Sequence, residues 1–120
     1  MDQNFLVWDT IASLIKRDQV MDENGNFTPY IEGQERSRRR LTALRRFFSS
    51  NGLLTVDVFD AEGELIDREY RKDDFTVEGL ELLRRKEGAW LKSKAAVKDP
   101  PDMKLLEKAL AEIRSGKSTV

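Results

Sequence analysis

The stretch that decides the fold lies near the middle of the chain, at residues 41–54, and has the sequence LTALRRFFSSNGLL. Leu41, Leu44 and Phe47 recur at helical spacing, and with Phe48 they predict the apolar side of a helix over residues 34–50. Asn51 and Gly52 then predict the end of this helix, because both residues tolerate the left-handed conformation of a C-cap.

A β-hairpin is predicted directly after this helix. Two strand-like runs, residues 53–60 and 65–71, flank the short connection AEGE at residues 61–64. Glycine in so short a connection is typical of a hairpin turn. Val56 and Val58 alternate with Asp57, as expected for a sheet with one face in water.

Before the central helix, the apolar residues recur at helical spacing and predict an amphipathic helix over residues 4–20. They are Phe5, Trp8, Ile11, Leu14 and Ile15. Residues 21–33 are predicted to form a loop, because Asn24-Gly25 favours a turn and Pro29 blocks a continuing helix. We expect the apolar side chains of this loop to pin it to the core. They are Phe27, Tyr30 and Ile31.

Two more helices are predicted after the hairpin. Thr76 can cap the first, with Phe75 and Leu80 at the two positions of a hydrophobic staple. The segment DPPD at residues 99–102 is expected to open the second, with the prolines in its first turn. The predicted buried stripes are Leu80, Leu83, Trp90 and Leu91 in one helix and Leu105, Leu106, Ala109, Leu110 and Ile113 in the other. Residues 115–120 are expected to form a frayed tail.

The order helix, loop, helix, hairpin, helix, helix predicts an α+β fold in one domain over residues 1–120. Residues 41–54, the hairpin, Tyr70 and the segment TVEG at 76–79 resemble the recognition helix, wing and following helix of winged-helix proteins. The resemblance implies a winged-helix-like fold. It leaves the function open, because one fold supports many functions.

A second resemblance concerns the C-terminal part of the chain. The segments DFTVEG at 74–79, WLKS at 90–93 and PDMKLLE at 101–107 resemble small bacterial proteins that are encoded beside contact-dependent toxins. This resemblance implies a protein of the immunity type, which binds and inhibits a toxin.

Composition limits the chemistry of the chain. Its 120 residues include no cysteine and no histidine, which removes thiolate nucleophiles, cysteine zinc sites and the usual base near neutral pH. No glycine-rich phosphate loop, nucleophile elbow or paired-acid motif is present. We therefore predict a protein that is not an enzyme and has no cofactor or metal ion. The N-terminal residues lack a basic region and no apolar run has membrane-spanning length, which predicts a cytoplasmic protein without membrane partners.

Charge is arranged in blocks although the net charge is only −1. Residues 32–56 carry six arginines against two glutamates, a net charge of +4. Residues 57–81 carry ten acidic against three basic residues, a net charge of −7, and residues 82–98 carry six basic residues against Glu87, a net charge of +5. Such alternation predicts opposed surface patches that affect the choice of partner.

The acidic hairpin is the first candidate site. Its carboxylates are Asp57, Asp60, Glu62, Glu64, Asp67 and Glu69. A dense anionic ridge suits a cationic protein partner, for example a nuclease toxin domain. The alternative is a charged edge that prevents strands of different molecules from pairing.

The arginine-rich helix is the second candidate site, for nucleic acid. Arg36, Arg39, Arg40 and Arg46 would contact phosphates or base edges if the chain were a winged-helix DNA-binding regulator. The alternative is that these arginines pair with the acidic hairpin. An acidic wing beside the helix would repel phosphate, so we favour protein binding. A third hypothesis is a structural subunit, which a large exposed apolar patch would indicate.

Two acidic segments match the pattern of a calcium-binding loop only in part. Asp22, Asn24 and Asn26 have the spacing that opens such a loop, but the twelfth position is Gly33, where a bidentate glutamate belongs. Residues 60–64 fail in the same way. Both segments are predicted to be turns.

Overall fold

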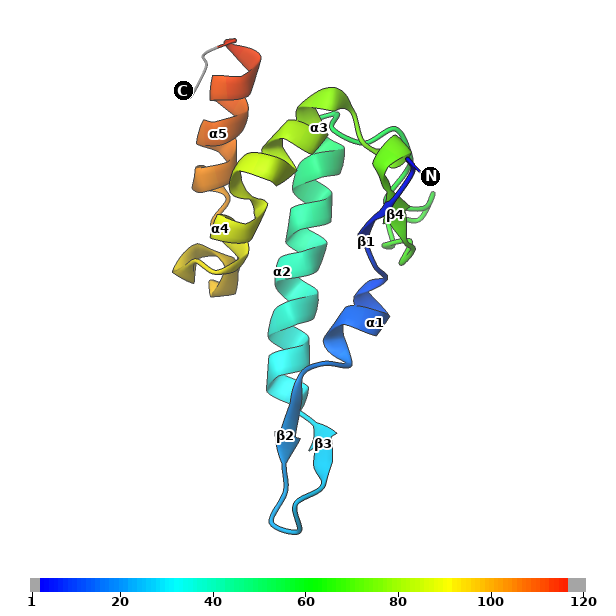
Figure 1. Ribbon diagram of the computed structural model, residues 1–120, viewed down its shortest axis with the longest axis vertical. Coiled ribbons are helices and arrows are strands. Elements are labelled where there is room, and N and C mark those ends of the chain that lie inside the picture. Colours follow the sequence, from blue (N-terminus) through cyan, green and yellow to red (C-terminus); the bar gives the residue numbers. More distant parts are fainter. Residues whose placement is uncertain (1–2, 117–120) are drawn as a thin grey trace.

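The computed structural model describes residues 3–116 and places one long helix at the centre of the molecule (Figure 1). This helix is α2 (Ile31–Ser50). On one side of it lie β1 (Leu6–Trp8), α1 (Ile11–Ile15) and β4 (Tyr70–Arg71). Towards the other side lie α3 (Val77–Leu82), α4 (Gly88–Leu91) and α5 (Lys104–Arg114). The architecture is α+β, as the sequence predicts.

The strands form two small antiparallel sheets. β1 pairs with β4, so that Trp8 lies opposite Tyr70. β2 (Gln19–Met21) pairs with β3 (Phe27–Pro29) and forms a hairpin that projects from the N-terminal end of α2 (Figure 1). The first sheet therefore joins distant parts of the chain, whereas the second is local.

A cluster of aromatic rings joins β1, α2 and β4. The ring of Trp8 meets those of Phe48, Tyr70 and Phe75 edge-on, at centroid distances of 5.0, 5.3 and 4.8 Å. Edge-to-face contact is a favourable geometry for aromatic pairs and adds to the burial of their surface. On the other side of α2 the core continues through Leu82, Trp90, Leu106 and Leu110.

The predicted helix over residues 4–20 is wrong. This segment contains β1, α1 and the first two residues of β2 (Gln19–Met21), and only Ile11–Ile15 is helical. Trp8 is buried from a strand that pairs with residues more than 60 positions away, and Thr10 caps a new helix by accepting the backbone N–H of Ser13 at 3.1 Å. Helical spacing of apolar residues does not reveal such a long-range partner, which overrides the local pattern.

The predicted loop over residues 21–33 is also corrected. It contains most of the β2–β3 hairpin, and α2 begins at Ile31. Phe27 and Ile31 are 66% and 58% exposed, so neither pins the segment to the core. The base of the hairpin is held by its backbone, because the N–H of Tyr30 donates to the carbonyl of Asp18 at 2.8 Å.

The predicted hairpin over residues 53–71 forms only at its tip. Phe59 and Leu65 make an isolated bridge, and the N–H of Ile66 donates to the carbonyl of Val58 at 2.7 Å. Beyond this point the two arms separate, because each has another partner. Leu54 bridges to Phe75, and the end of the second arm becomes β4 and pairs with β1.

The C-terminal predictions hold in part. The hydroxyl of Thr76 accepts the N–H of Gly79 at 3.1 Å, so the predicted cap of α3 is confirmed. A π-helical segment, η2 (Leu83–Glu87), connects α3 to α4, and the 3-10 segment η3 (Lys94–Val97) follows. Pro100 and Pro101 precede α5, so the prediction that they lie in its first turn is wrong. Of the predicted tail, residues 117–120 lie outside the described residues.

Two glycines of this region have opposite requirements. A Cβ added at Gly79 would lie 2.5 Å from the backbone oxygen of Leu53, whereas a Cβ at Gly88 would meet nothing within 4 Å. We expect Gly79→Ala to lower the free energy of unfolding by about 1–3 kcal/mol, because overpacking forces the backbone apart. Gly88→Ala should raise it by about 0.5–1 kcal/mol, because alanine loses less backbone entropy in a helix. Urea denaturation measures both changes, and effects of the same sign would contradict this packing.

Candidate protein-docking surface

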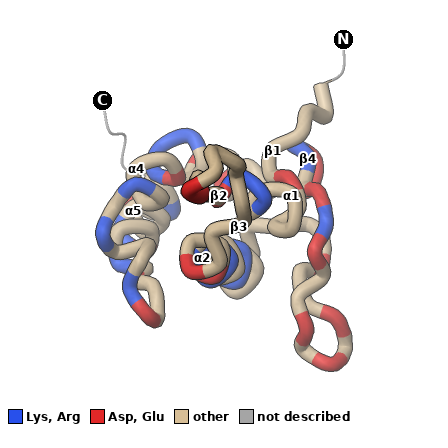
Figure 2. The backbone as a smooth tube through the Cα atoms, turned by 90° about the horizontal axis from the view of Figure 1, so that it is seen from below, with Lys and Arg blue, Asp and Glu red and all other residues tan. Residues whose placement is uncertain are grey.

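The acidic loop, defined as Asp57, Asp60, Glu62 and Glu64, projects from the molecule away from α4 and α5 (Figure 2). All four side chains belong to exposed residues. Within residues 3–116, no lysine or arginine forms an ion pair with any of the four. Their negative charge therefore faces water and is open to a partner.

The tip of the acidic loop has a defined backbone. One carboxylate oxygen of Asp60 accepts the N–H groups of Glu62 and Glu64, both at 2.9 Å, and Gly63 takes the left-handed conformation with φ 82°. The carbonyl of Glu64 also accepts the N–H of Asp60 at 2.8 Å. The predicted turn is confirmed, and its bonds keep Glu62 and Glu64 in a fixed frame.

The acidic loop is fastened to α2 by apolar contact and stacking. Val58 is 1% exposed and belongs to the core. The guanidinium of Arg46 lies over the ring of Phe59 at 4.6 Å from its centroid. Such cation–π contact is worth about 0.5–1 kcal/mol at an exposed site. It places a cation of α2 directly beside the acidic loop.

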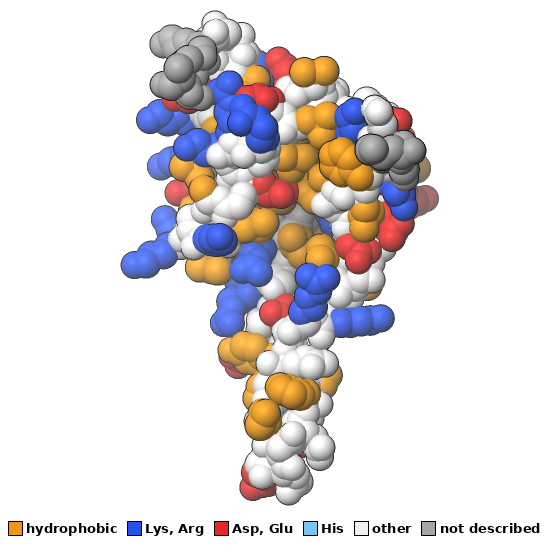
Figure 3. Space-filling view, viewed as in Figure 1, with side chains coloured by type: hydrophobic (Ala, Val, Ile, Leu, Met, Phe, Trp, Pro, Cys, Tyr) orange, Lys and Arg blue, Asp and Glu red, His pale blue; other side chains and the backbone are white. Residues whose placement is uncertain are grey.

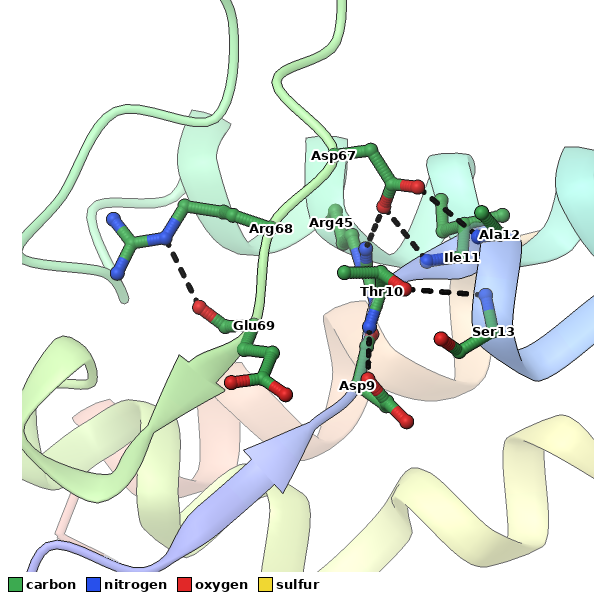
Figure 4. A network of polar contacts seen from close by, with 9 residues as sticks. All are labelled: Asp9, Thr10, Ile11, Ala12, Ser13, Arg45, Asp67, Arg68 and Glu69. Carbon is green, nitrogen blue, oxygen red and sulfur yellow. Dashed lines mark hydrogen bonds and ion pairs between the residues drawn. The ribbon is translucent and has the colours of Figure 1, made fainter.

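Asp67 has an internal role that separates it from the acidic loop (Figure 4). Its carboxylate accepts the N–H groups of Ile11 at 2.7 Å and Ala12 at 3.0 Å, at the start of α1. It also pairs with Arg45 at 3.3 Å. Because these contacts occupy the side chain, we leave Asp67 out of the docking surface. Glu69 is exposed, and Figure 4 shows its carboxylate turned away from the Arg45–Asp67 pair.

Arg45 of α2 pairs with Asp67 of the predicted acidic hairpin, and it is only 1% exposed. Its guanidinium donates to the backbone carbonyl of Asp9 at 2.6 Å and lies over the rings of Trp8 and Tyr70. Burial lowers the pKa of Arg45, against the opposing effects of Tyr70 and Asp67. The sequence offered one signal for this role, since Arg45 lies between the apolar positions 44 and 47 of the helix.

The four arginines of the nucleic-acid hypothesis lie on different sides of α2. Arg39 and Arg46 line a groove on one side, and Arg40 lines a cleft on the other. Arg36 stacks on the ring of Tyr30 near the start of the helix. Arg39 forms an ion pair with Asp99 at 3.6 Å, and Arg40 donates to the Ser37 hydroxyl at 3.4 Å.

The groove between α2 and the segment before α5 has a volume of about 920 Å³. Its apolar lining includes Ala43, Phe47, Pro100 and Met103. Arg46 lines the groove and also stacks on Phe59, so one end of the groove adjoins the acidic loop. An apolar hollow next to a ridge of carboxylates is suited to a protein partner that presents both cationic and apolar side chains.

The cleft on the opposite side of α2 is smaller, about 370 Å³, and is lined by β1, α1, α2 and the end of η2. In it the carboxylate of Glu87 accepts the indole N–H of Trp8 at 2.5 Å. Burial raises the pKa of Glu87, while the bond from Trp8 and the charge of Arg45 oppose that rise. Sequence reasoning missed Glu87, although it is the one acidic residue in the basic block 82–98.

The described residues contain neither a metal-holding cluster nor a membrane-spanning helix. Residues 3–116 contain no group of three or more acidic, histidine or cysteine side chains arranged to hold a metal ion. Asp22 instead holds its own turn by accepting the N–H groups of Asn24 and Asn26, both at 2.9 Å. No helix in this part of the chain is both long and apolar enough to cross a membrane.

Comparison with known proteins returned no similarity. No protein-family model, no curated protein and no solved structure matches the chain.

Proposed function

We propose that this chain is a non-catalytic protein-binding domain whose acidic loop docks on a cationic protein surface. The finer proposal is an immunity-type inhibitor whose partner is a toxin domain encoded beside it. The observation that carries the proposal is the acidic loop: exposed carboxylates, held by a bonded turn, with no ion pair inside residues 3–116. Unpaired charge of one sign on a rigid projection favours fast, specific association with the opposite charge.

The surroundings of the acidic loop support the same proposal. The adjoining groove offers apolar surface from Phe47 and Met103, which a partner side chain would bury. Binding energy at protein interfaces is concentrated in a few such buried anchors, whereas exposed charges set the association rate. The basic residues of α5 lie on the far side of α2 (Figure 2), so they do not neutralise the acidic loop.

The test uses the product of the adjacent gene and a variant with Asp57→Asn, Glu62→Gln and Glu64→Gln. Asp60 is retained because its carboxylate holds the turn. We expect the association rate at low salt to fall about tenfold or more, with a smaller change in the dissociation rate. Surface plasmon resonance at two salt concentrations measures both rates.

The control variant removes the same number of charges elsewhere, by Glu32→Gln, Asp73→Asn and Glu112→Gln. It should change the association rate only by the small effect of net charge. Equal effects of the two triple variants would exclude the acidic loop as the docking site. Failure of the adjacent gene product to bind, or to be neutralised on co-expression, would exclude the immunity proposal.

The alternative proposal is a winged-helix DNA-binding regulator. What supports it is the alignment of Arg39 and Arg46 along one open groove. It requires affinity for duplex DNA that falls steeply with salt, because each phosphate contact releases counterions. Unchanged mobility of duplex DNA at low salt would exclude this alternative.

A further inference from the structure

The β2–β3 hairpin exposes large apolar side chains at the narrow end of the molecule (Figure 3). Val20, Met21 and Phe27 are 43%, 58% and 66% exposed. An isolated two-stranded hairpin is at best marginally stable in water, and independent stability needs three or more strands or packing against a helix. A contiguous exposed apolar patch is a mark of an interaction site.

One edge of this hairpin, that of β2, keeps all of its outward backbone N–H and C=O groups. The N–H of Asp22 donates to the carbonyl of Asn26, and the N–H of Tyr30 donates to that of Asp18. Bonded pairs alternate in an antiparallel ladder, so Val20 and Thr28 form the next bonded pair, while residues 19 and 21 direct their N–H and C=O groups outwards. The β3 edge lacks one donor, because Pro29 has no N–H. The β2 edge is therefore the better template for another strand.

The side chains divide the hairpin into two different faces. Met21 lies directly opposite Phe27, and Gln19 lies opposite Pro29, so these four share one face. The other face carries Asp18 and Tyr30, which contact α2 through Ser37 and Arg36. The face with Met21 and Phe27 is thus turned away from the rest of the chain. A strand added at the β2 edge would extend it.

The charges that flank β2 indicate which strand would be added at its edge. Lys16 and Arg17 precede β2, and Asp22 and Glu23 follow it. Lys16, Arg17 and Glu23 are exposed, and none of them forms an ion pair within residues 3–116. When a second β2 runs antiparallel to the first, the basic end of each strand meets the acidic end of the other. The segment is complementary to itself, as an interface around a two-fold axis requires.

We propose that β2 is a self-pairing edge through which two copies of this chain form a dimer with a four-stranded antiparallel sheet. The order of strands is β3–β2–β2–β3, with Gln19 and Met21 supplying the outward backbone bonds. Met21 and Phe27 of both copies then form one continuous apolar face. An interface of a single strand edge is small and belongs to the weak, reversible class.

The test is a charge exchange followed by analytical ultracentrifugation of the purified chain. Arg17→Glu alone and Glu23→Lys alone should each weaken the dimer about tenfold, because each creates two like-charge contacts across the axis. The double variant with both substitutions should restore the dimer. An equimolar mixture of the two single variants should also restore association, as a heterodimer. Lys108→Glu, an exposed charge reversal on α5, is the control and should leave association unchanged.

A second variant examines the backbone edge. Gln19→Pro removes an outward N–H and leaves the bonds between β2 and β3 intact, so it should weaken the dimer without lowering the thermal unfolding midpoint. A wild-type chain that is monomeric up to about 1 mM overturns the proposal, since weak dimers dissociate in the micromolar range. A dimer that is unaffected by Arg17→Glu or by Gln19→Pro overturns it as well. Because only this chain is used, these outcomes do not depend on the toxin partner.

Discussion

Replacing Arg45 with methionine is expected to lower the free energy of unfolding by about 3 kcal/mol, near the low end for breaking a buried ion pair. The guanidinium is 1% exposed and holds the Asp9 carbonyl and the Asp67 carboxylate together. Methionine fills part of the space but donates no hydrogen bond, so the Asp9 carbonyl loses its donor. The low end applies because the Asp67 side chain is 31% exposed and regains water when its partner is removed.

Urea denaturation monitored by tryptophan fluorescence measures this loss. Arg46→Met is the matched control. Arg46 is the next residue of α2, but it is exposed and stacks on Phe59. It should cost no more than about 1 kcal/mol, the value of an exposed cation–π contact. A double-mutant cycle of Arg45→Met with Asp67→Asn should show coupling, since the two side chains are in contact. Equal stability of the two methionine variants would contradict the stabilising role of the Arg45 contacts.

Replacing Trp90 with alanine is expected to cost about 3–5 kcal/mol, the range for large-to-small changes of a buried aromatic residue. Trp90 is 0% exposed and lies in the core formed with Leu82, Leu106 and Leu110. Its indole N–H also donates to the carbonyl of Asp102 at 2.8 Å, which ties α4 to the segment before α5. Since a domain is stable by about 5–15 kcal/mol, this change removes a large share of the total.

Trp90→Phe separates the two contributions of the side chain. It retains most of the apolar burial but removes the donor to the Asp102 carbonyl, which should cost about 1–3 kcal/mol. Val77→Ala is the control, because Val77 is 84% exposed at the start of α3. It should change stability by less than about 0.5 kcal/mol. Thermal and urea unfolding of all three variants measures the order of their stabilities. A Trp90→Ala chain as stable as the Trp90→Phe chain would contradict the predicted order.

Features that depend on neighbouring residues could be predicted from the sequence. Gly52 takes the left-handed conformation with φ 67°, and the N–H of Leu53 donates to the carbonyl of Phe48 at 2.9 Å. The end of α2 therefore lies where Asn51 and Gly52 indicate. The turns at residues 22–26 and 60–64 have the same pattern of bonds, each made by an aspartate and a glycine within five residues. Such signals are local, so no tertiary contact is needed to interpret them.

Features that depend on distant partners could not be predicted in this way. Phe5, Trp8 and Ile11 have helical spacing, yet Trp8 lies in a strand because it pairs with β4 and packs against Phe75. The second arm of the predicted hairpin does not continue as a strand at Asp67, whose carboxylate pairs with Arg45 and accepts a backbone N–H at the start of α1. The contacts of Asp67 join residues 22 to 56 positions apart, and no periodicity within a segment records them.

By itself, the sequence determined the local ends of helices and turns, the mixed α+β class and the presence of charge in blocks, because each of these follows from residues close together in the chain. Only the tertiary structure decided which charges remain open. It buried Arg45, bonded Asp67 to Arg45 and to the start of α1, and left Asp57, Glu62 and Glu64 facing water. It also left the β2 edge exposed. The physical reason is that burial and pairing depend on distances in space, which charge order and apolar spacing along a chain do not contain.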